Sequence, residues 1–346
     1  MNSRLVTLIA LKTLALLILA GPAAAVDLKI ATIAPEGSTW MKDMRGAAAE
    51  IAERTDGRVN IKLYGGGVMG DDKKVLRKIR IGQLHGGVFT ANSMEQYYPD
   101  LNIYGLPLLF ETPAEVDYVR ERIDPKLEEG LEEAGFVSFG FAGGGFARFL
   151  SGTPVRSVDD LKGKKVWVPE GDQISYRAME ALDLSPVTLP VTDVLTGLQT
   201  GLIDIVASPP VAVLVLQWHT KVDYLTELPL LYTLGYLAID KRAFSRLSEA
   251  DQAVVDEVMN RVYENFDRIN QADNEDALAA LANTGVDFVE PAAGAIDRWR
   301  EPVMAANRSL AEEGYLSPEL LDEVLALLAE YRAQAAPTAQ ADGDSP

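Results

Sequence analysis

The chain has 346 residues, contains no cysteine and carries a formal net charge of −19, from 51 acidic and 32 basic residues. The lack of cysteine excludes disulfides, thiolate metal sites and thiol nucleophiles. An acidic surface repels nucleic-acid phosphates and anionic lipid, so we expect neither as a partner. With 48% hydrophobic residues, a chain of this length has enough apolar surface for two cores, and we expect two domains.

The first 25 residues have the pattern of a secretory signal peptide. Arg4 and Lys12 flank the start of an apolar run that ends near Ala20, and three consecutive alanines then resemble a cleavage site. The apolar run is too short to span a membrane. We therefore expect residues 1–25 to be removed and the mature protein to be soluble and located in the periplasm.

Hydrophobic periodicity predicts alternating strands and helices along most of the chain. In the first part, we expect strands at 28–33, 59–64, 88–90 and 137–141, and helices at 39–54, 73–81 and 116–133. In the second part, we expect strands at 166–168, 187–189, 203–207 and 236–239, and helices at 173–182 and 193–200. This alternation predicts the α/β class, with mainly parallel sheets flanked by helices.

A much longer helix is predicted near the C-terminal end. Ser248 is its expected N-cap, with Asp251 three residues on, and the helical pattern runs from 249 to about 281 before Gly285 ends it. A helix of this length needs a structural reason, and one that spans both domains supplies it. The Ala-, Pro- and Asp-rich tail, residues 334–346, is expected to be disordered.

Residues 65–70 match the glycine pattern of a dinucleotide-binding loop and lie between a predicted strand and a predicted helix. However, Asp71 and Asp72 occupy the start of that helix, where they would cap it and repel a pyrophosphate. We therefore interpret the loop as a glycine turn whose backbone approaches the neighbouring domain.

The sequence offers little for catalysis. It contains no nucleophile elbow and no zinc-protease motif, and His85 and His219 are far apart without a recognisable partner. The acidic pairs lie at predicted helix starts, where capping explains them. We expect no enzyme activity, no metal and no cofactor.

The stretch 155–172 is more informative, because it reads as a basic corner, a short apolar strand and an acidic loop. Ligands bind at the carboxyl ends of strands in open α/β sheets, so Trp167 and Glu170 are candidates to line a cavity there. A core tryptophan beside a solvated acidic loop is an equally weighted alternative.

The corner at 160–165, DLKGKK, is similar to that of the DctP-like solute-binding proteins of TRAP transporters, and other motifs agree in order. These are Ala34-Pro35-Glu36-Gly37-Ser38 followed by Trp40, the glycine loop with Asp71 and Asp72, Tyr98-Pro99, Gly105-Leu106-Pro107, and Leu198-Gln199-Thr200-Gly201 with Asp204. The resemblance implies a two-domain periplasmic binding protein fold with a ligand cleft between the domains. We expect residues 26–143 plus 234–270 in domain I and 144–233 plus 271–333 in domain II.

The resemblance also implies a function. Such a protein captures a small organic ligand and delivers it to an ATP-independent permease made of a large and a small membrane subunit. Such a protein carries out no covalent chemistry on its ligand. We expect it to be a monomer. An exported sensor that reports to a membrane receptor kinase is the alternative, and an exported enzyme is a third reading.

Many members of the resembled family grip a ligand carboxylate with an arginine at the strand corner, where this chain has Trp167. Alignment by eye with the family's motifs gives the candidate ligand contacts: Trp167, Glu170, Arg148, Thr90, Ser93, Val191 and Ser208, with Trp40 from the first motif. Three ligand classes stay open: an apolar or aromatic ligand stacked on Trp167, a cation held by Trp167 and Glu170, and a carboxylate held by Arg148.

Overall fold

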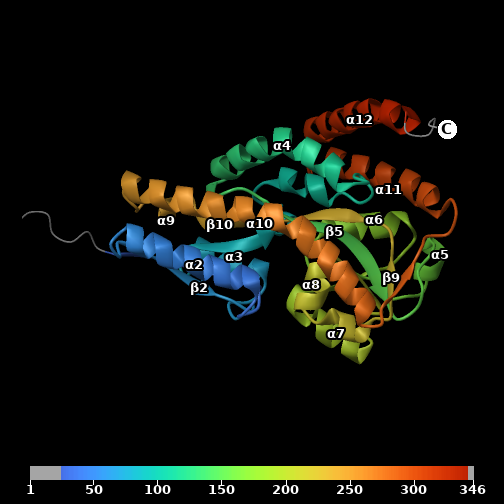
Figure 1. Ribbon diagram of the computed structural model, residues 1–346, viewed down its shortest axis with the longest axis horizontal. Helices are drawn as coiled ribbons and strands as arrows, with labels where there is room; N and C mark the ends of the chain where they lie inside the picture. The colour runs from blue at the N-terminus through green and yellow to red at the C-terminus, as the bar shows by residue number, and fades with distance from the viewer. Residues whose placement is uncertain (1–24, 342–346) are drawn as a thin grey trace, which may run out of the picture.

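The computed structural model describes residues 25–341, so the predicted signal peptide lies outside the described residues except for its last one. The elements form two units (Figure 1), and the strands of residues 25–341 form one nine-stranded sheet that runs through both units and a separate two-stranded sheet. Within residues 25–341, no helix is long and apolar enough to cross a bilayer.

The first unit has three parallel strands at its centre. Strand β1 (Val26–Ala31) pairs with β2 (Val59–Tyr64) on one side and with β3 (Gly86–Thr90) on the other. Helices α2 (Thr39–Arg54) and α3 (Asp72–Arg80) connect them, as the sequence predicted. The apolar faces of these elements are buried in two hydrophobic clusters, one of which includes the long C-terminal helix.

The second unit combines a parallel pair with shorter strands. Strands β6 (Trp167–Pro169) and β7 (Val187–Leu189) pair in parallel. Strand β9 (Tyr224–Thr226) pairs in parallel with β11 (Asp287–Val289). A single parallel bridge joins Ile205, the first residue of strand β8 (Ile205–Ser208), to Val166, the residue just before β6.

Two long strands join the units. Strands β5 (Ala142–Ser151) and β10 (Leu231–Asp240) run antiparallel to each other, with an irregularity between Thr233 and Leu234. Strand β10 also pairs with β3, and β5 also pairs with β8 and β9, so both strands belong to both units. The sheets are therefore mixed, not mainly parallel as expected, because each crossing strand enters antiparallel to its neighbours.

Helix α10 (Glu249–Asn283) is a single helix of 35 residues, which confirms the predicted long helix. It contacts α2 of the first unit, α8 (Pro210–Val215) of the second, and β5 between them. Figure 1 shows it passing along one unit, bending near its middle and continuing along the other. In that middle stretch, Asn274 Nδ2 donates to the helix's own Asn270 carbonyl at 2.8 Å, a local cause for a bend.

The remaining elements cover the sheets and connect the strands. They are η1 (Ala91–Met94), η2 (Pro99–Gly105), α4 (Pro113–Glu133), β4 (Phe136–Val137), α5 (Val158–Leu161), α6 (Gln173–Ala181), η3 (Val191–Asp193), α7 (Val194–Thr200), η4 (Trp218–Lys221), α9 (Lys241–Phe244), α11 (Ala295–Glu312) and α12 (Pro318–Ala341). Helix α12 lies against α4 and α11 (Figure 1). It continues to Ala341, past residue 334, where we expected the disordered tail to begin.

The predicted strand at 137–141 is not found in that register. Strand β4 ends at Val137 and β5 begins at Ala142, so the three glycines from Gly143 onward lie inside a strand instead of a loop. Their place in β5 is set by pairing with β10, about 90 residues away, which the local pattern cannot show.

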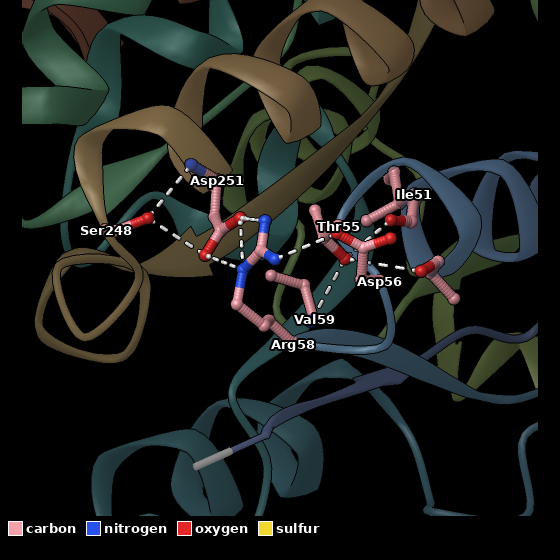
Figure 2. A network of polar contacts seen from close by, with 8 residues as sticks. Ile51, Thr55, Asp56, Arg58, Val59, Ser248 and Asp251 are labelled. Carbon is pink, nitrogen blue, oxygen red and sulfur yellow. Dashed lines mark hydrogen bonds and ion pairs between the residues drawn. The ribbon is translucent and has the colours of Figure 1, made fainter. Parts of the chain in front are cut away.

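The start of α10 is tied to the first unit by an ion pair. Arg58 Nη2 lies 2.9 Å from Asp251 Oδ1, and the Ser248 hydroxyl donates to Asp251 Oδ2 at 2.9 Å (Figure 2). The Asp251 amide in turn donates to the Ser248 hydroxyl, so the predicted cap is present. The Arg58 guanidinium holds the pKa of Asp251 below its usual value. This contact fixes one end of the helix that crosses both units.

Candidate ligand cleft

A cleft of about 880 Å³ lies between the two units. Its lining comes from β5, β6, β10, α6, α8 and α10, and from the loop between β1 and α2. Both crossing strands and the long helix therefore contribute to its walls. A cavity of this size between two units is the usual form of a small-molecule site.

The lining is mainly apolar and rich in aromatic side chains. These are Trp40, Phe149, Trp167, Trp218, Tyr232, Phe266 and Trp299. Trp40 stacks on Phe266 of α10 with ring centroids 5.5 Å apart. Such a wall favours the apolar body of a ligand over a strongly hydrated one.

All charged side chains that line the cleft, among the described residues, are aspartates. They are Asp43, Asp172, Asp273 and Asp276. No lysine, arginine or histidine of residues 25–341 is part of the lining. The cleft therefore has no guanidinium fork for a ligand carboxylate.

Trp167 combines both interpretations of the sequence. Its side chain is only 5% exposed and packs edge-on against Trp218 at 5.4 Å, as a core residue would. Its indole Nε1 donates to the Leu189 carbonyl at 2.9 Å, so its polar group is already used inside the protein. The ring nevertheless forms part of the cleft wall.

Glu170 and Arg148 are not part of the cleft lining. Glu170 Oε1 accepts from Lys73 Nζ at 3.2 Å, in a contact that joins the second unit to α3 of the first. Arg148 lies in β5 between Ala147 and Phe149, which both line the cleft. Because side chains alternate along a strand, Arg148 belongs to the opposite face. Burial lowers its pKa, and the charge of Glu227 partly opposes that effect.

The other predicted contacts divide in the same way. Trp40, Thr90, Val191 and Ser208 line the cleft, whereas Ser93 does not. Ser93 donates to the Asp72 carboxylate and lies 2.8 Å from the Thr90 hydroxyl. Burial raises the pKa of Asp72 to about 6. Ser93 therefore hydrogen-bonds to the first residue of α3.

A buried polar corner of the cleft was missed by the sequence reasoning. Asn102 of η2 is 1% exposed and Asp172, the N-cap of α6, is 8% exposed, and both line the cleft. The Asp172 carboxylate accepts from the Ser175 amide at 2.9 Å. Asp172 could have been found from the sequence, because it is an acidic residue at the start of a predicted helix. No feature of the sequence around Asn102 distinguishes it from other polar residues.

The floor of the cleft is a glycine segment of β5 clamped by α10. Asn270 Nδ2 donates to the Gly143 carbonyl at 2.6 Å, and Asn274 Nδ2 donates to the Gly144 carbonyl at 2.9 Å. The Gly143 amide donates to Asp267 Oδ1 at 2.8 Å. A side chain at Gly143 or Gly144 would collide with Tyr232 or Thr233. Those two residues belong to β10, whereas a side chain at Gly145 would collide with Asn274 of α10, so the glycines leave room for both neighbours of β5.

The glycine loop at 65–70 reaches the second unit, as expected. Gly67 has a positive φ of 69°, and a Cβ placed on it would lie 3.0 Å from Thr192 Cγ2 in η3. Asp71 caps α3 by accepting from the Lys74 amide at 2.9 Å. The helix cap by Asp71 and the close approach of Gly67 to Thr192 account for this glycine loop, and neither requires a bound nucleotide.

Comparison with known proteins shows the family. Residues 30–313 match the model of the bacterial extracellular solute-binding proteins, family 7 (DctP), and the chain belongs to this family. The C4-dicarboxylate-binding periplasmic protein DctP of Rhodobacter capsulatus is 26% identical over 296 residues, covering 83% of this chain and 87% of that protein.

Solved structures agree on the fold. The sugar acid binding protein DctPAm from Advenella mimigardefordensis, in complex with galactonate, superposes with a TM-score of 0.81 at 21% identity, covering 89% of this chain and 99% of that one. A TRAP periplasmic solute-binding protein from Desulfovibrio salexigens with bound orotic acid gives 0.79 at 20% identity, with 88% and 99% covered. The chain therefore has the two-domain fold of the TRAP solute-binding proteins.

Proposed function

We propose that this protein captures a small organic ligand in the periplasm and delivers it to a TRAP-type permease with a large and a small membrane subunit. The observation that carries the proposal is the cleft of about 880 Å³ between units joined by β5 and β10 in a member of the DctP family. Binding, release and docking are the whole mechanism, and no bond is made or broken.

We further propose that the ligand is not a simple carboxylate held by an arginine. The similar proteins named above bind a C4-dicarboxylate, galactonate and orotic acid, all of them acids. Support for a different ligand comes from the lining of this cleft, whose charged side chains are all acidic. We assign the ligand contacts among the predicted residues to those that line the cleft: Trp40, Thr90, Trp167, Val191 and Ser208.

Two measurements test this function. Native mass spectrometry of gently purified protein should find a retained small molecule at one per chain, and a cleft-filling variant, Ala147→Trp, should lose it. Vesicles that contain the cognate permease should then accumulate that molecule only with this protein and an ion gradient, without ATP. Chemical conversion of the molecule by the protein would instead identify an enzyme, and uptake without the protein would contradict its delivery role.

A further inference from the structure

The aromatic side chains of the cleft wall differ in how much surface they leave for a ligand. Five of them are buried: Phe149, Trp167, Trp218, Phe266 and Trp299. Trp40 of α2 and Tyr232 of β10 are partly exposed. Phe266 stacks on one face of Trp40, with ring centroids 5.5 Å apart, so the surface that Trp40 keeps lies on its edges and its other face. Trp40 is therefore the tryptophan of the cleft with the most surface left for a ligand.

The hydrogen-bond donors of the wall are largely used inside the protein. Asn102 Nδ2, Trp167 Nε1 and the Thr233 hydroxyl each donate to a backbone carbonyl, at 2.9–3.1 Å. Asn270 and Asn274 likewise donate to carbonyls of β5. An ionised carboxylate needs several donors to replace the water that it loses on burial. Donors that already have a protein acceptor do not supply them.

The carboxylates of the wall do not form a cation site either. Asp172 is buried, and it accepts from the Ser175 amide at the start of α6. Asp273 and Asp276 are exposed on α10, and Asp43 is partly exposed. Exposed charges are hydrated and screened by salt, so they hold a cationic ligand weakly. Among the described residues, the one buried carboxylate of the wall is thus engaged as a helix cap, and the other three compete with water.

We infer that the cleft takes an uncharged organic molecule with a flat apolar ring, and that this ring stacks on Trp40. This inference rests on the proposed ligand-binding function and names the ligand class of the same cleft. Of the other classes that the sequence left open, a cation held by Trp167 and Glu170 lacks Glu170 in the lining, and a carboxylate lacks Arg148. A neutral ring needs neither, because burial of its apolar surface against the aromatic wall supplies the binding free energy.

Three naphthalene compounds of similar shape and different charge test the ligand class. They are 2-naphthylmethanol (uncharged), 2-naphthylmethylamine (a cation at neutral pH) and 2-naphthoate (an anion), each titrated by calorimetry into protein that has been unfolded and refolded to remove any retained ligand. The alcohol should bind at least about tenfold more tightly than either ion, the equivalent of about 1.4 kcal/mol. Neither ion finds a buried partner that replaces its water.

Variants of Trp40 test the stacking. Trp40→Leu keeps an apolar side chain but loses the flat ring, so its affinity for 2-naphthylmethanol should fall about tenfold, and Trp40→Phe should lose less. Tyr118→Leu is the matched control, because Tyr118 is also partly exposed and packs on another ring, that of Tyr331 at 5.2 Å, but lies outside the cleft lining. It should bind as the wild type does. Melting curves verify that the variants are folded.

The opposite outcomes overturn the inference. Either ion binding as tightly as 2-naphthylmethanol would reject the uncharged class while leaving the proposed ligand-binding function intact, and this comparison in the wild type does not depend on the folding of any variant. Wild-type affinity in Trp40→Leu, or an equal loss in Tyr118→Leu, would reject the stacking on Trp40. Absence of binding by all three compounds would also reject the inference, and the native mass measurement would then decide separately whether the cleft holds any ligand.

Discussion

Trp167 belongs both to the core and to the cleft wall, and this double role changes what its replacement should do. Truncating a buried tryptophan removes packing, so Trp167→Ala should lower the free energy of unfolding by roughly 3–5 kcal/mol and weaken ligand binding as well. Trp167→Arg would bury a charge beside Trp218 and should be worse. Paired melting and titration curves measure both effects. Normal melting with lost affinity would contradict the core role.

Glu95 should make the stability of the ligand-free protein depend on pH. Its pKa is raised to about 7 from an ordinary value of 4.5, so between these pH values the native state binds more protons than the unfolded state. Stability from this group is therefore present below about pH 4.5 and is lost as the pH rises through 7. Because Glu95 is only partly buried, we expect a loss on the order of 1 kcal/mol.

Glu95→Gln should therefore melt higher than the wild type at pH 8 and about equally at pH 5. Differential scanning calorimetry at both pH values measures this, with the exposed Glu170→Gln as the control. The same melting difference at both pH values would show that Glu95 does not titrate in this window.

At the scale of single residues, the sequence predicted which segments reach the cleft better than it predicted which way a side chain points. The family motifs led to Trp40, Thr90, Val191 and Ser208, which do line the cleft. Arg148 lies outside the lining, because its direction depends on where β5 begins. Asn102 could not be found, because its place in the cleft wall depends on segments far from it in the sequence.

At the scale of elements, the helices followed from local pattern and the crossing strands did not. Helices α2, α3 and α10 carry apolar faces and caps that are visible in sequence. Strands β5 and β10 pair with each other over residues 142–147 and 231–235, where they cross between the units, and the pairing places glycines inside a strand. Distant pairing overrides local preference there.

The middle of α10 gives a test at this scale. Asn270→Pro removes a helical hydrogen bond and introduces a ring clash, so it should cost roughly 3 kcal/mol or more of stability and impair ligand binding. Asn270→Ala is the matched control: it loses only the contact to the Gly143 carbonyl and should cost about 1 kcal/mol. Chemical denaturation measures both. A proline variant as stable as the alanine variant would mean that helix continuity does not matter at this point.

At the scale of the whole molecule, the two units are joined by the β5 and β10 crossing, which α10 clamps, and we expect this crossing to act as a hinge. The units also meet where Gly67 faces Thr192 and where Lys73 pairs with Glu170. A ligand that contacts both units stabilises the closed arrangement over an open one.

Small-angle scattering should therefore show a smaller radius of gyration when the ligand found by native mass spectrometry is added to saturation. An exposed ion pair is worth about 0–1 kcal/mol, so Lys73→Ala should weaken binding only a few-fold. Unchanged dimensions at saturation would contradict ligand-driven closure.

The contact between Gly67 and Thr192 gives a sharper test of the same closure. In Gly67→Ala, the new Cβ would lie 3.0 Å from Thr192 Cγ2, so closure should be opposed and affinity should fall. The strain of the positive φ at this position is the same in the open and closed forms and should lower stability without changing affinity. Adding Thr192→Ala removes the colliding methyl group and should restore affinity but not melting temperature. Affinity that stays low in the double variant would mean that Gly67 acts through its own loop and not through contact with the second unit.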